Sequence, residues 1–391
     1  MVRLPYRRAP LDAPRPGWAR DAFVLPRAPG GGDAVYLAGN SLGAQPHAAR
    51  RALLSAVDDQ WAAVGVAGWE ERGWWAAPQR LGDRIAPLVG AAAGQVVVGD
   101  STSVQLFGLL VAAARLRPDR TVLLSDAGHF PTDRYLATSV ARLTGLTLET
   151  GAPPAMDPDE RTAVVAVPAV DFRTGERWDL APIVARAHDA GAVVVADLSH
   201  AVGVMPVDLD GLGVDLAVGC TYKYLNGGPG APAFAYVARR HHDVLDPPLT
   251  GWTGHADPFA MTEAWTPAPG VGRLRVGTPP MLALLALDGA LDVFDGVDLA
   301  AVRAASLALG DAFLEALPPG VEVVTPREHA RRGGHVAVRV GDAEGLCSAL
   351  ARRGVVVDAR PPDLLRFGFA APYVTLDDAR TAARELAALL G

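Results

Sequence analysis

Lysine is almost missing from this sequence. The chain has 391 residues and 36 basic Lys and Arg side chains, yet Lys223 is the only lysine. Arginine does not lose its proton in proteins, whereas lysine can, and its neutral amine forms Schiff bases with carbonyl compounds. A compositional drift toward arginine and alanine could also leave one lysine behind by chance. The residues around Lys223 must therefore decide between chemistry and chance.

Asparagine and isoleucine are nearly as scarce, with two of each in the chain. Asn226 lies three positions after Lys223 in residues 221–230 (TYKYLNGGPG), and Asn40 lies in residues 39–43 (GNSLG). Both asparagines thus stand in glycine-rich turns. Asparagine and glycine are the residues that tolerate the unusual backbone conformations of such turns.

Cysteine is rare, and long apolar runs are missing. Cys220 and Cys347 have no metal-type spacing and form no disulfide framework, and Cys220 ends an apolar run as a small buried residue would. No run of 18 uncharged apolar residues is present, and residues 1–8 (MVRLPYRR) lack the apolar centre of a signal peptide. We therefore expect a cytoplasmic protein without a membrane partner.

The chain also lacks an excess of positive charge. Its net charge is −7, and the arginines are mixed with acidic residues along the sequence. A nucleic-acid-binding protein would need a basic patch or stripe. The composition therefore predicts no nucleic-acid partner, and ligand-binding arginines must be sought one by one.

The length favours two domains, since one hydrophobic core rarely keeps growing beyond about 250–300 residues. Hydrophobic periodicity predicts strands and helices that alternate in the first part of the chain. Expected strands cover residues 35–37, 95–98, 121–125, 163–167, 192–196, 216–218, 231–237, 322–325, 335–340, 355–358 and 364–369. Expected helices cover residues 46–64, 80–89, 101–116, 131–144, 180–190, 281–294, 299–317, 344–353 and 376–390.

This alternation predicts an α/β fold with a parallel sheet covered by helices on both faces. Residues 1 to about 34 are expected to form an irregular arm, residues 231–237 an antiparallel return strand, and the last 70 or so residues a compact α+β domain. Ligands of parallel sheets bind beyond the carboxyl ends of the strands. Asp100, Asp126, Asp197 and the pair Tyr222 and Lys223 all follow predicted strands, so they can converge.

Lys223 and Asp197 together suit pyridoxal phosphate. Its aldehyde needs a lysine amine, and its ring nitrogen needs a carboxylate that keeps it protonated. Thr102 and Ser103 open a predicted helix, where free backbone N–H groups and the helix dipole could hold the phosphate. Phe130 could cover the ring. Each feature also has a plainer interpretation, since Ser, Thr and Asp serve as simple helix caps or strand ends.

Residues 65–75 (GVAGWEERGWW) place Trp69 and two further tryptophans between glycines. Such a cluster can be ordinary core packing, or it can form a wall for a flat aromatic ligand. The sequence pattern alone leaves both interpretations open.

Six segments resemble the kynureninase family along nearly the whole chain. They are residues 36–43 (YLAGNSLG), 130–135 (FPTDRY), 197–200 (DLSH), 222–230 (YKYLNGGPG), 251–255 (GWTGH) and 365–369 (LRFGF). The first and fourth segments are specific, whereas the Asp and His of the third are shared with other members of the fold. The resemblance implies a pyridoxal phosphate-dependent enzyme of fold type I, with a mainly parallel seven-stranded sheet. It further implies an N-terminal arm over residues 1–45 that contributes to the small domain, a large cofactor-binding domain over 46–280 and a small domain over 281–391.

The resemblance also implies a role for each site residue. Lys223 forms the Schiff base and is catalytic together with Tyr222, Asp197 pairs with the ring nitrogen, and Phe130 stacks on the ring. The other implied cofactor-binding residues are Thr102, Ser103, Thr132, Asp133, His200, Tyr222, Trp252 and Thr278. The implied substrate-binding residues are Ser41, Trp69 and Arg366, and no metal is expected. A planar guanidinium at Arg366 suits the substrate α-carboxylate.

By the same resemblance the reaction is the hydrolytic cleavage of the Cβ–Cγ bond of L-kynurenine to anthranilate and L-alanine, in tryptophan catabolism by the kynurenine pathway and in NAD biosynthesis. A homodimer with shared active sites is implied, so that Trp252 and Thr278 reach the cavity of the partner. Trp69 and Thr278 replace the His and Asn of animal forms, which predicts a preference for kynurenine over 3-hydroxykynurenine. Ala38 and residues 371–373 (APY) depart from the usual family pattern, which concerns local loops.

Other functions of the same fold remain alternatives. A cysteine desulfurase-like enzyme needs a catalytic cysteine in a mobile loop, whereas Cys220 and Cys347 fall in or beside predicted strands and helices. An aminotransferase-like enzyme is the other alternative within the fold. A non-catalytic sensor of pyridoxal phosphate would normally add a basic DNA-binding module, and the sequence shows none.

Overall fold

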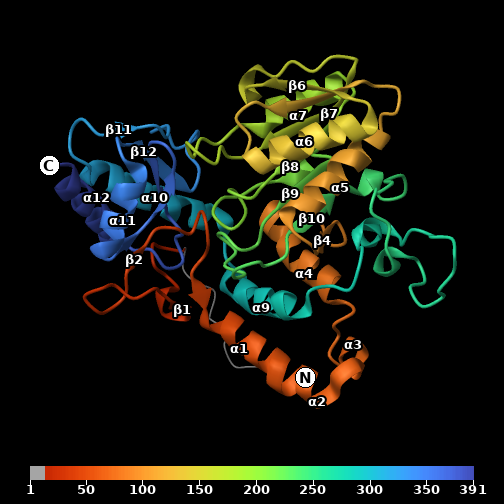
Figure 1. Ribbon diagram of the computed structural model, residues 1–391, viewed down its shortest axis with the longest axis horizontal. Coiled ribbons are helices and arrows are strands. Elements are labelled where there is room, and N and C mark those ends of the chain that lie inside the picture. Colours follow the sequence, from red (N-terminus) through yellow and green to blue (C-terminus); the bar gives the residue numbers. More distant parts are fainter. Residues whose placement is uncertain (1–13) are drawn as a thin grey trace.

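The structure is a computed structural model that describes residues 14–391. The first 13 positions of the expected arm, with the segment tested for a signal peptide, lie outside the described residues. In the described part the chain forms a large domain around a seven-stranded sheet and a smaller domain that holds the C-terminus (Figure 1). No helix of residues 14–391 is long and apolar enough to span a bilayer.

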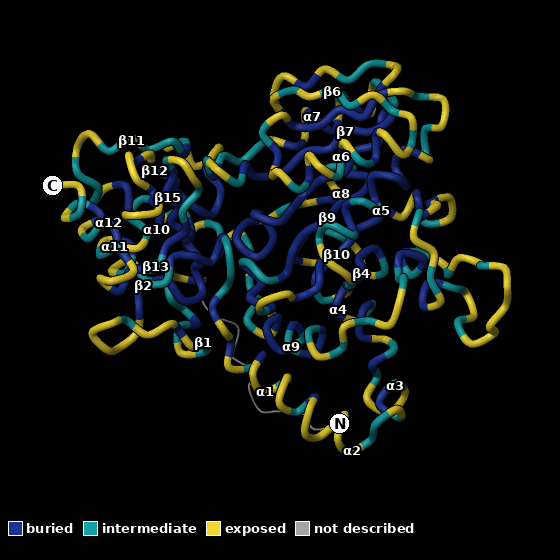
Figure 2. The backbone as a smooth tube through the Cα atoms, viewed as in Figure 1, coloured by how far each residue is buried: buried dark blue, intermediate teal, exposed yellow. Residues whose placement is uncertain are grey.

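The large sheet confirms the predicted α/β fold. Its strand order is β4-β10-β9-β8-β7-β5-β6, and β10 runs antiparallel to both neighbours while the other pairs are parallel. The strands are β4 (Val96–Val98), β5 (Val122–Asp126), β6 (Thr147–Gly151), β7 (Thr162–Pro168), β8 (Val193–Asp197), β9 (Leu216–Gly219) and β10 (Phe234–Val237). All except β6 are buried throughout, as expected for strands covered on both faces (Figure 2).

Strand β6 was not predicted. It is one of the two edge strands of the sheet and is only partly buried, so it lacks the continuous apolar run that marks the central strands. Tertiary pairing with β5 sets its conformation, and sequence pattern does not reveal such pairing.

Most helices of the large domain lie close to the predicted positions, whereas the short helices over residues 68–71 and 209–212 were not predicted. The helices of this domain are α1 (His47–Ser55), α2 (Ala62–Val64), α3 (Gly68–Glu71), α4 (Ala77–Ile85), α5 (Thr102–Arg115), α6 (Pro131–Thr144), α7 (Leu180–Asp189), α8 (Leu209–Leu212) and α9 (Met281–Leu291). The single helix expected over residues 46–64 is interrupted by a π-helical segment over Ala56–Trp61. Helix α9 packs closely on α1, because a side chain at Gly289 would lie 2.5 Å from the Ala48 carbonyl oxygen.

The small domain combines an antiparallel sheet, in the order β11-β12-β15-β14, with three helices. Its strands are β11 (Glu322–Val323), β12 (His335–Arg339), β13 (Val355–Val356), β14 (Asp358–Arg360) and β15 (Leu364–Gly368), and its helices are α10 (Leu299–Ala316), α11 (Ala343–Arg352) and α12 (Leu376–Leu390). Strand β1 (Phe23–Val24) pairs with β3 (Gln45–Pro46), and β2 (Val35–Tyr36) pairs in parallel with β13. The pairing of β2 with β13 supports our proposal that residues before 45 contribute to the small domain. The expected division near residue 280 stays a prediction, and α9 just after it packs on α1 of the large domain.

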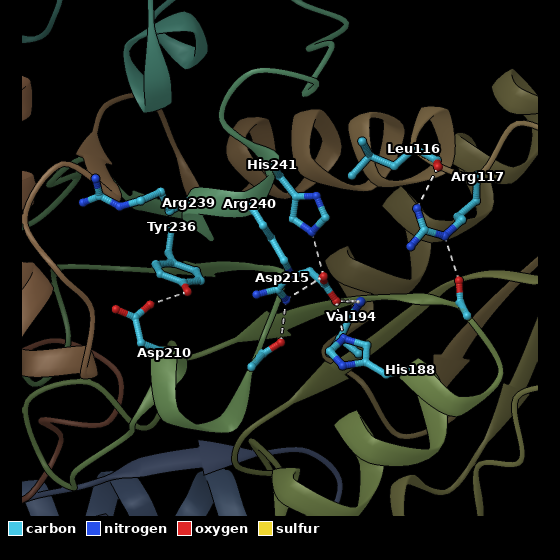
Figure 3. Close-up of polar contacts among 12 residues, drawn as sticks. Leu116, Arg117, His188, Val194, Asp210, Asp215, Tyr236, Arg239, Arg240 and His241 are labelled. Carbon is cyan, nitrogen blue, oxygen red and sulfur yellow. Dashed lines mark hydrogen bonds and ion pairs between the residues drawn. The ribbon is translucent and has the colours of Figure 1, made fainter.

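A buried carboxylate ties the sheet of the large domain to its flanking segments (Figure 3). Asp215 accepts hydrogen bonds from His188 and Arg240, at 2.8 and 2.7 Å, and from the backbone N–H of Val194 at 2.8 Å; His241 Nε2 lies 2.7 Å from the same carboxylate. Burial, the largest influence, opposes the charge, but these partners hold the pKa of Asp215 well below its ordinary value. These residues therefore form a cluster of ion pairs that stabilises the fold, and the cluster lies away from the cavity described next.

Candidate active site

A cavity of about 160 Å³ lies beyond the carboxyl ends of the parallel strands. It collects all but three of the predicted site residues. Those residues are Ser41, Thr102, Ser103, Phe130, Thr132, Asp133, Asp197, His200, Tyr222, Lys223 and Arg366. They come from both domains, since Arg366 belongs to β15 and the others to the large domain or the segment before it. The position agrees with the rule for ligand sites in open α/β sheets.

Lys223 follows β9 in a turn that fixes its backbone. Asn226 adopts the left-handed conformation at φ 59° and donates from its side chain to the Tyr224 carbonyl at 2.8 Å. Gly43 packs against this turn, because a Cβ there would lie 2.3 Å from the Lys223 carbonyl oxygen. The glycine-rich segments around the two asparagines therefore meet at the lysine, which explains why both are built from small and turn-forming residues.

The lysine amine lies against a neutral histidine. Nζ of Lys223 is 2.9 Å from Nε2 of His200. Burial, and after it the charge of Lys223, lowers the pKa of His200 well below the ordinary value. The ring of His335 lies beside it at 5.4 Å between centroids, and burial likewise lowers the pKa of His335. A neutral His200 can accept a proton in a hydrogen bond from Lys223 without repelling its charge.

Three titratable groups gather at the end of β8. Asp197 is buried and accepts a hydrogen bond from the Ser199 N–H at 2.8 Å. A carboxylate oxygen of Asp197, a ring nitrogen of His129 and a carboxylate oxygen of Asp133 all lie within 4.8 Å of one another. Nδ1 of His129 lies 2.9 Å from Asp133. Burial and the charge of Asp133 raise the pKa of Asp197. The structure thus places Asp133, one of the implied cofactor-binding residues, beside Asp197.

The same three residues have the spacing of metal-ligand atoms. They line the cavity beside Lys223, where a carboxylate partner for a protonated ring nitrogen is needed. We therefore expect them to serve the cofactor, and the expectation of no metal also stays a prediction.

The N-terminus of α5 offers a site for an anion such as the cofactor phosphate. Ser101 caps this helix by accepting from the Val104 N–H at 3.3 Å, and Thr102 and Ser103 of its first turn line the cavity. Asp100 just before them adopts a left-handed φ of 50°, a strained conformation for a non-glycine residue. Free N–H groups and the positive end of a 14-residue helix favour a phosphate at this position.

Phe130 leaves 42% of its surface exposed although it lines the cavity. Its free surface can take a flat ring. Phe172 meets Phe130 edge-on, with 5.1 Å between centroids and 89° between planes. Phe172 and its neighbour Asp171 were missed by the sequence analysis, although they lie shortly after the carboxyl end of β7, next to β8 whose last residue is Asp197. The strand-end rule applied to every strand would have found them.

Arg366 is fully buried on β15. Its Nε donates to Asp358 at 2.8 Å, and its Nη1 donates to the Phe172 carbonyl. The backbone of Phe172 thereby links the large domain to this arginine. Arg360 also lines the cavity, and no sequence motif had singled it out.

Trp69, Trp252 and Thr278 do not line this cavity. Trp69 contacts Trp74 and Trp75, at 5.6 and 6.4 Å between centroids, and Trp75 contacts Trp252 at 5.3 Å. Thr278 lies in a separate hollow of about 60 Å³. The structure of one chain therefore does not bring these three residues to Lys223.

The residues that do meet there fit pyridoxal phosphate. A lysine amine, a buried carboxylate, an open aromatic face and a free helix N-terminus line one cavity. Solved structures agree with this class of protein. A cysteine desulfurase from Escherichia coli superposes with a TM-score of 0.78 at 21% identity, over 95% of this chain and 97% of that one. A C-DES mutant with glycine linked to its PLP cofactor gives a TM-score of 0.78 at 17% identity, over 94% and 98%. The protein thus has the fold of type I pyridoxal phosphate enzymes.

Sequence comparisons narrow the class to one family. The kynureninase C-terminal domain profile matches residues 302–386. The kynureninase of Deinococcus radiodurans is 46% identical over 97% of this chain and 95% of its own length. A kynureninase of Burkholderia pseudomallei is 42% identical over 95% and 91%. The chain belongs to the kynureninase family, whose members are pyridoxal phosphate-dependent hydrolases of carbon–carbon bonds.

Proposed function

We propose that this protein hydrolyses the Cβ–Cγ bond of L-kynurenine to give anthranilate and L-alanine. The observation that carries this proposal is the cavity in which the only lysine of the chain meets Asp197 and a buried arginine from the other domain. The lysine and the carboxylate serve a cofactor, and the arginine serves an amino-acid substrate. Family membership supports the particular reaction.

Bound pyridoxal phosphate supplies an electron sink for carbanions of the substrate. Arg366 binds the α-carboxylate and thereby points the amino-acid end of the substrate toward Lys223. Lys223 removes the proton from Cα, and neutral His200 holds the lysine amine through its 2.9 Å contact. Water adds to the γ-carbonyl carbon and the Cβ–Cγ bond breaks, so that the aryl carbonyl part leaves as anthranilate. The β-carbon takes up a proton, and the three-carbon amino acid leaves as L-alanine.

Tyr222 is our candidate for the acid that protonates the β-carbon. It lines the cavity next to Lys223 in sequence. Burial raises its pKa above the ordinary value, so that the phenol keeps its proton at neutral pH. A protonated hydroxyl at this place can donate to a carbanion. The alternative is that Tyr222 only anchors the phosphate.

Trp69, Trp252 and Thr278 support the proposal of a homodimer with shared active sites. They lie away from the cavity of their own chain, and Trp252 contacts the exposed Phe259 with 6.0 Å between ring centroids. If a second copy of the chain covers this surface, the three residues can reach the cavity of that second copy. Sedimentation analysis at micromolar concentration should then give the mass of two chains.

Substrate preference and setting follow from the same proposal. Trp69 and Thr278 offer less polar recognition of a ring hydroxyl than His and Asn would, which favours kynurenine over 3-hydroxykynurenine. We place the reaction in tryptophan catabolism by the kynurenine pathway and in NAD biosynthesis. We place the protein in the cytoplasm, without a nucleic-acid or membrane partner.

A cysteine desulfurase-like activity is the alternative that the fold allows. Both cysteines lie in the described part of the chain, and neither lines the cavity. Cys220 is buried, with its thiol 3.7 Å from the Ser199 carbonyl, and Cys347 lies on α11.

The experiment that separates these activities offers L-kynurenine and L-cysteine separately to the purified holoenzyme. We expect anthranilate fluorescence with the first and no sulfide with the second. Sulfide release without anthranilate would reverse the assignment.

A further inference from the structure

The cavity holds a second arginine whose position follows from the pairing of two strands. Asp358 of β14 lies directly opposite Arg366 of β15 in the antiparallel register. Arg360 follows Asp358 by two positions on β14. Since side chains two positions apart share one face of a strand, all three side chains project from the same face of the sheet. The chain thus places two arginines around one carboxylate at the cavity.

The contacts show that Asp358 is shared between both arginines. Its Oδ1 accepts the hydrogen bond from Nε of Arg366 at 2.8 Å, and its Oδ2 lies 3.1 Å from Nη2 of Arg360. The side chain of Asp358 is 8% exposed and that of Arg366 is fully buried. Two guanidinium groups and one carboxylate leave one positive charge in excess.

The two histidines that feel the charges of these arginines do not cancel the excess. Burial lowers the pKa of both His200 and His335, so that they add no charge at neutral pH. Asp171, a further carboxylate at the cavity, pairs with Arg173. Burial, and after it the charge of Arg366, lowers the pKa of Arg360 as well. A partly buried excess charge is costly unless an anion pairs with it.

Donor groups on both arginines remain available. Nε of Arg360 is buried and makes no hydrogen bond within residues 14–391. Nη2 of Arg366 approaches Oδ1 of Asp358 at 2.8 Å but without the direction of a hydrogen bond. The side chain of Arg360 is 33% exposed and lines the cavity, so a ligand can reach it.

We propose that Arg360 is a second substrate-binding arginine, which grips the α-carboxylate of the amino acid together with Arg366. Asp358 is the positioning residue that fixes the spacing of the two guanidinium groups. The α-carboxylate carries one negative charge, which balances the excess positive charge of Arg360, Arg366 and Asp358. Two guanidinium groups can also donate more charge-assisted hydrogen bonds to the carboxylate than one can. The inference rests on the proposed function only in taking the ligand to be an α-amino acid.

The test compares two small amines on the holoenzyme, followed by the absorbance of the bound cofactor. L-Alanine carries the α-carboxylate, and ethylamine is the same molecule without it. Loss of a charge-assisted hydrogen bond should weaken L-alanine binding about tenfold in Arg360→Gln. Arg360→Lys should recover part of the loss, and ethylamine should bind to all variants alike.

Arg353→Gln is the matched control, because Arg353 forms an exposed ion pair with Glu385 in the same domain, away from the cavity. It should bind both amines as the unchanged protein does. Unchanged L-alanine binding in Arg360→Gln would overturn the inference. An equal loss for L-alanine and ethylamine would overturn it too, because the effect would not concern the carboxylate.

The readout also separates this inference from the reaction. If Arg360→Gln lowers turnover of L-kynurenine while L-alanine binds normally, Arg360 acts on another part of the substrate and the inference is wrong. If the unchanged protein makes no anthranilate but binds L-alanine in an Arg360-dependent manner, the proposed function fails and the inference stands.

Discussion

Nζ of Lys223 and Nε2 of His200 lie 2.9 Å apart, and the histidine is buried in its neutral form. The contact joins the turn after β9 to the turn after β8. It positions the lysine amine with a group that accepts a proton in a hydrogen bond but does not compete for charge. This relationship gives a prediction about proton transfer.

Replacement of His200 by Leu should slow the exchange of the α-hydrogen of L-alanine with solvent about tenfold, since the lysine amine loses the hydrogen bond that orients it. Proton NMR in D₂O measures this exchange. Because the pKa of His200 is lowered, the unchanged protein should show no titration of this group near the ordinary histidine value of about 6.5.

The control for that variant is His329→Gln on the exposed surface, where His329 pairs with Asp311. It should exchange at the rate of the unchanged protein. Equal rates in all three proteins would show that His200 does not assist Lys223.

Tyr222→Phe removes the proposed acid but keeps the ring. If Tyr222 protonates the β-carbon, kcat for L-kynurenine should fall by about 10²- to 10⁴-fold with little change in KM, as for other general acids. Steady-state kinetics and a cofactor-binding titration measure the two effects. Tyr135→Phe, at a residue 68% exposed, is the control. If the variant binds the cofactor more weakly but keeps a normal kcat, Tyr222 is a phosphate anchor only.

Asp215→Asn tests the buried ion cluster rather than the reaction. At pH 7 the free energy of unfolding should fall by about 1–3 kcal/mol, because His188, Arg240 and His241 lose the buried charged acceptor that they share. The folded protein holds the pKa of Asp215 below the unfolded value of about 3.9. Its contribution is therefore complete above that pH and is lost as the pH falls further.

Urea unfolding at pH 7 and at acid pH measures both parts of this expectation. The difference between Asp215→Asn and the unchanged protein should shrink as the pH falls below about 4. Asp243→Asn, at an exposed position of the same segment, should change little. A deficit that is the same at all pH values would contradict the ionic role.

The double variant Trp69→His with Thr278→Asn tests substrate preference. New hydrogen-bonding groups should raise kcat/KM for 3-hydroxykynurenine relative to kynurenine by about tenfold, the size expected for one added polar contact. Parallel assays with both substrates give the ratio. Thr262→Asn, on the exposed loop after Phe259, is the control. No change in the ratio would show that the two residues do not reach the aromatic ring.

The sequence predicted much of this fold because its central strands are continuous apolar runs and its helices have clear ends. Helices α6 and α12 begin and end at the predicted residues. Helix α6 starts with Pro131 and is followed by Gly145, and α12 starts with a capping box between Thr375 and Asp378. Strand β6 lacked such signals because its pairing with β5 decides it.

The site divides in the same way. The meeting of Lys223 and Asp197 in one cavity could be predicted because Asp197 ends a strand and Lys223 lies in the turn after the neighbouring strand. Arg360 enters the cavity through the pairing of β14 with β15, and such tertiary placement has no local sequence signal. Phe172 lies shortly after the end of β7, so the strand-end rule could have found it. The roles of Trp69, Trp252 and Thr278 depend on a second chain, so they stay predictions.

The most direct measurement of the central claim is the product balance of the holoenzyme with L-kynurenine, compared with Lys223→Ala. We predict anthranilate and L-alanine in equal amounts from the unchanged protein and neither product from the variant. We also predict that borohydride fixes the cofactor to the unchanged chain only, because no other lysine is present. A lack of anthranilate from the loaded protein, or a cofactor fixed to the Lys223→Ala chain, would contradict the account.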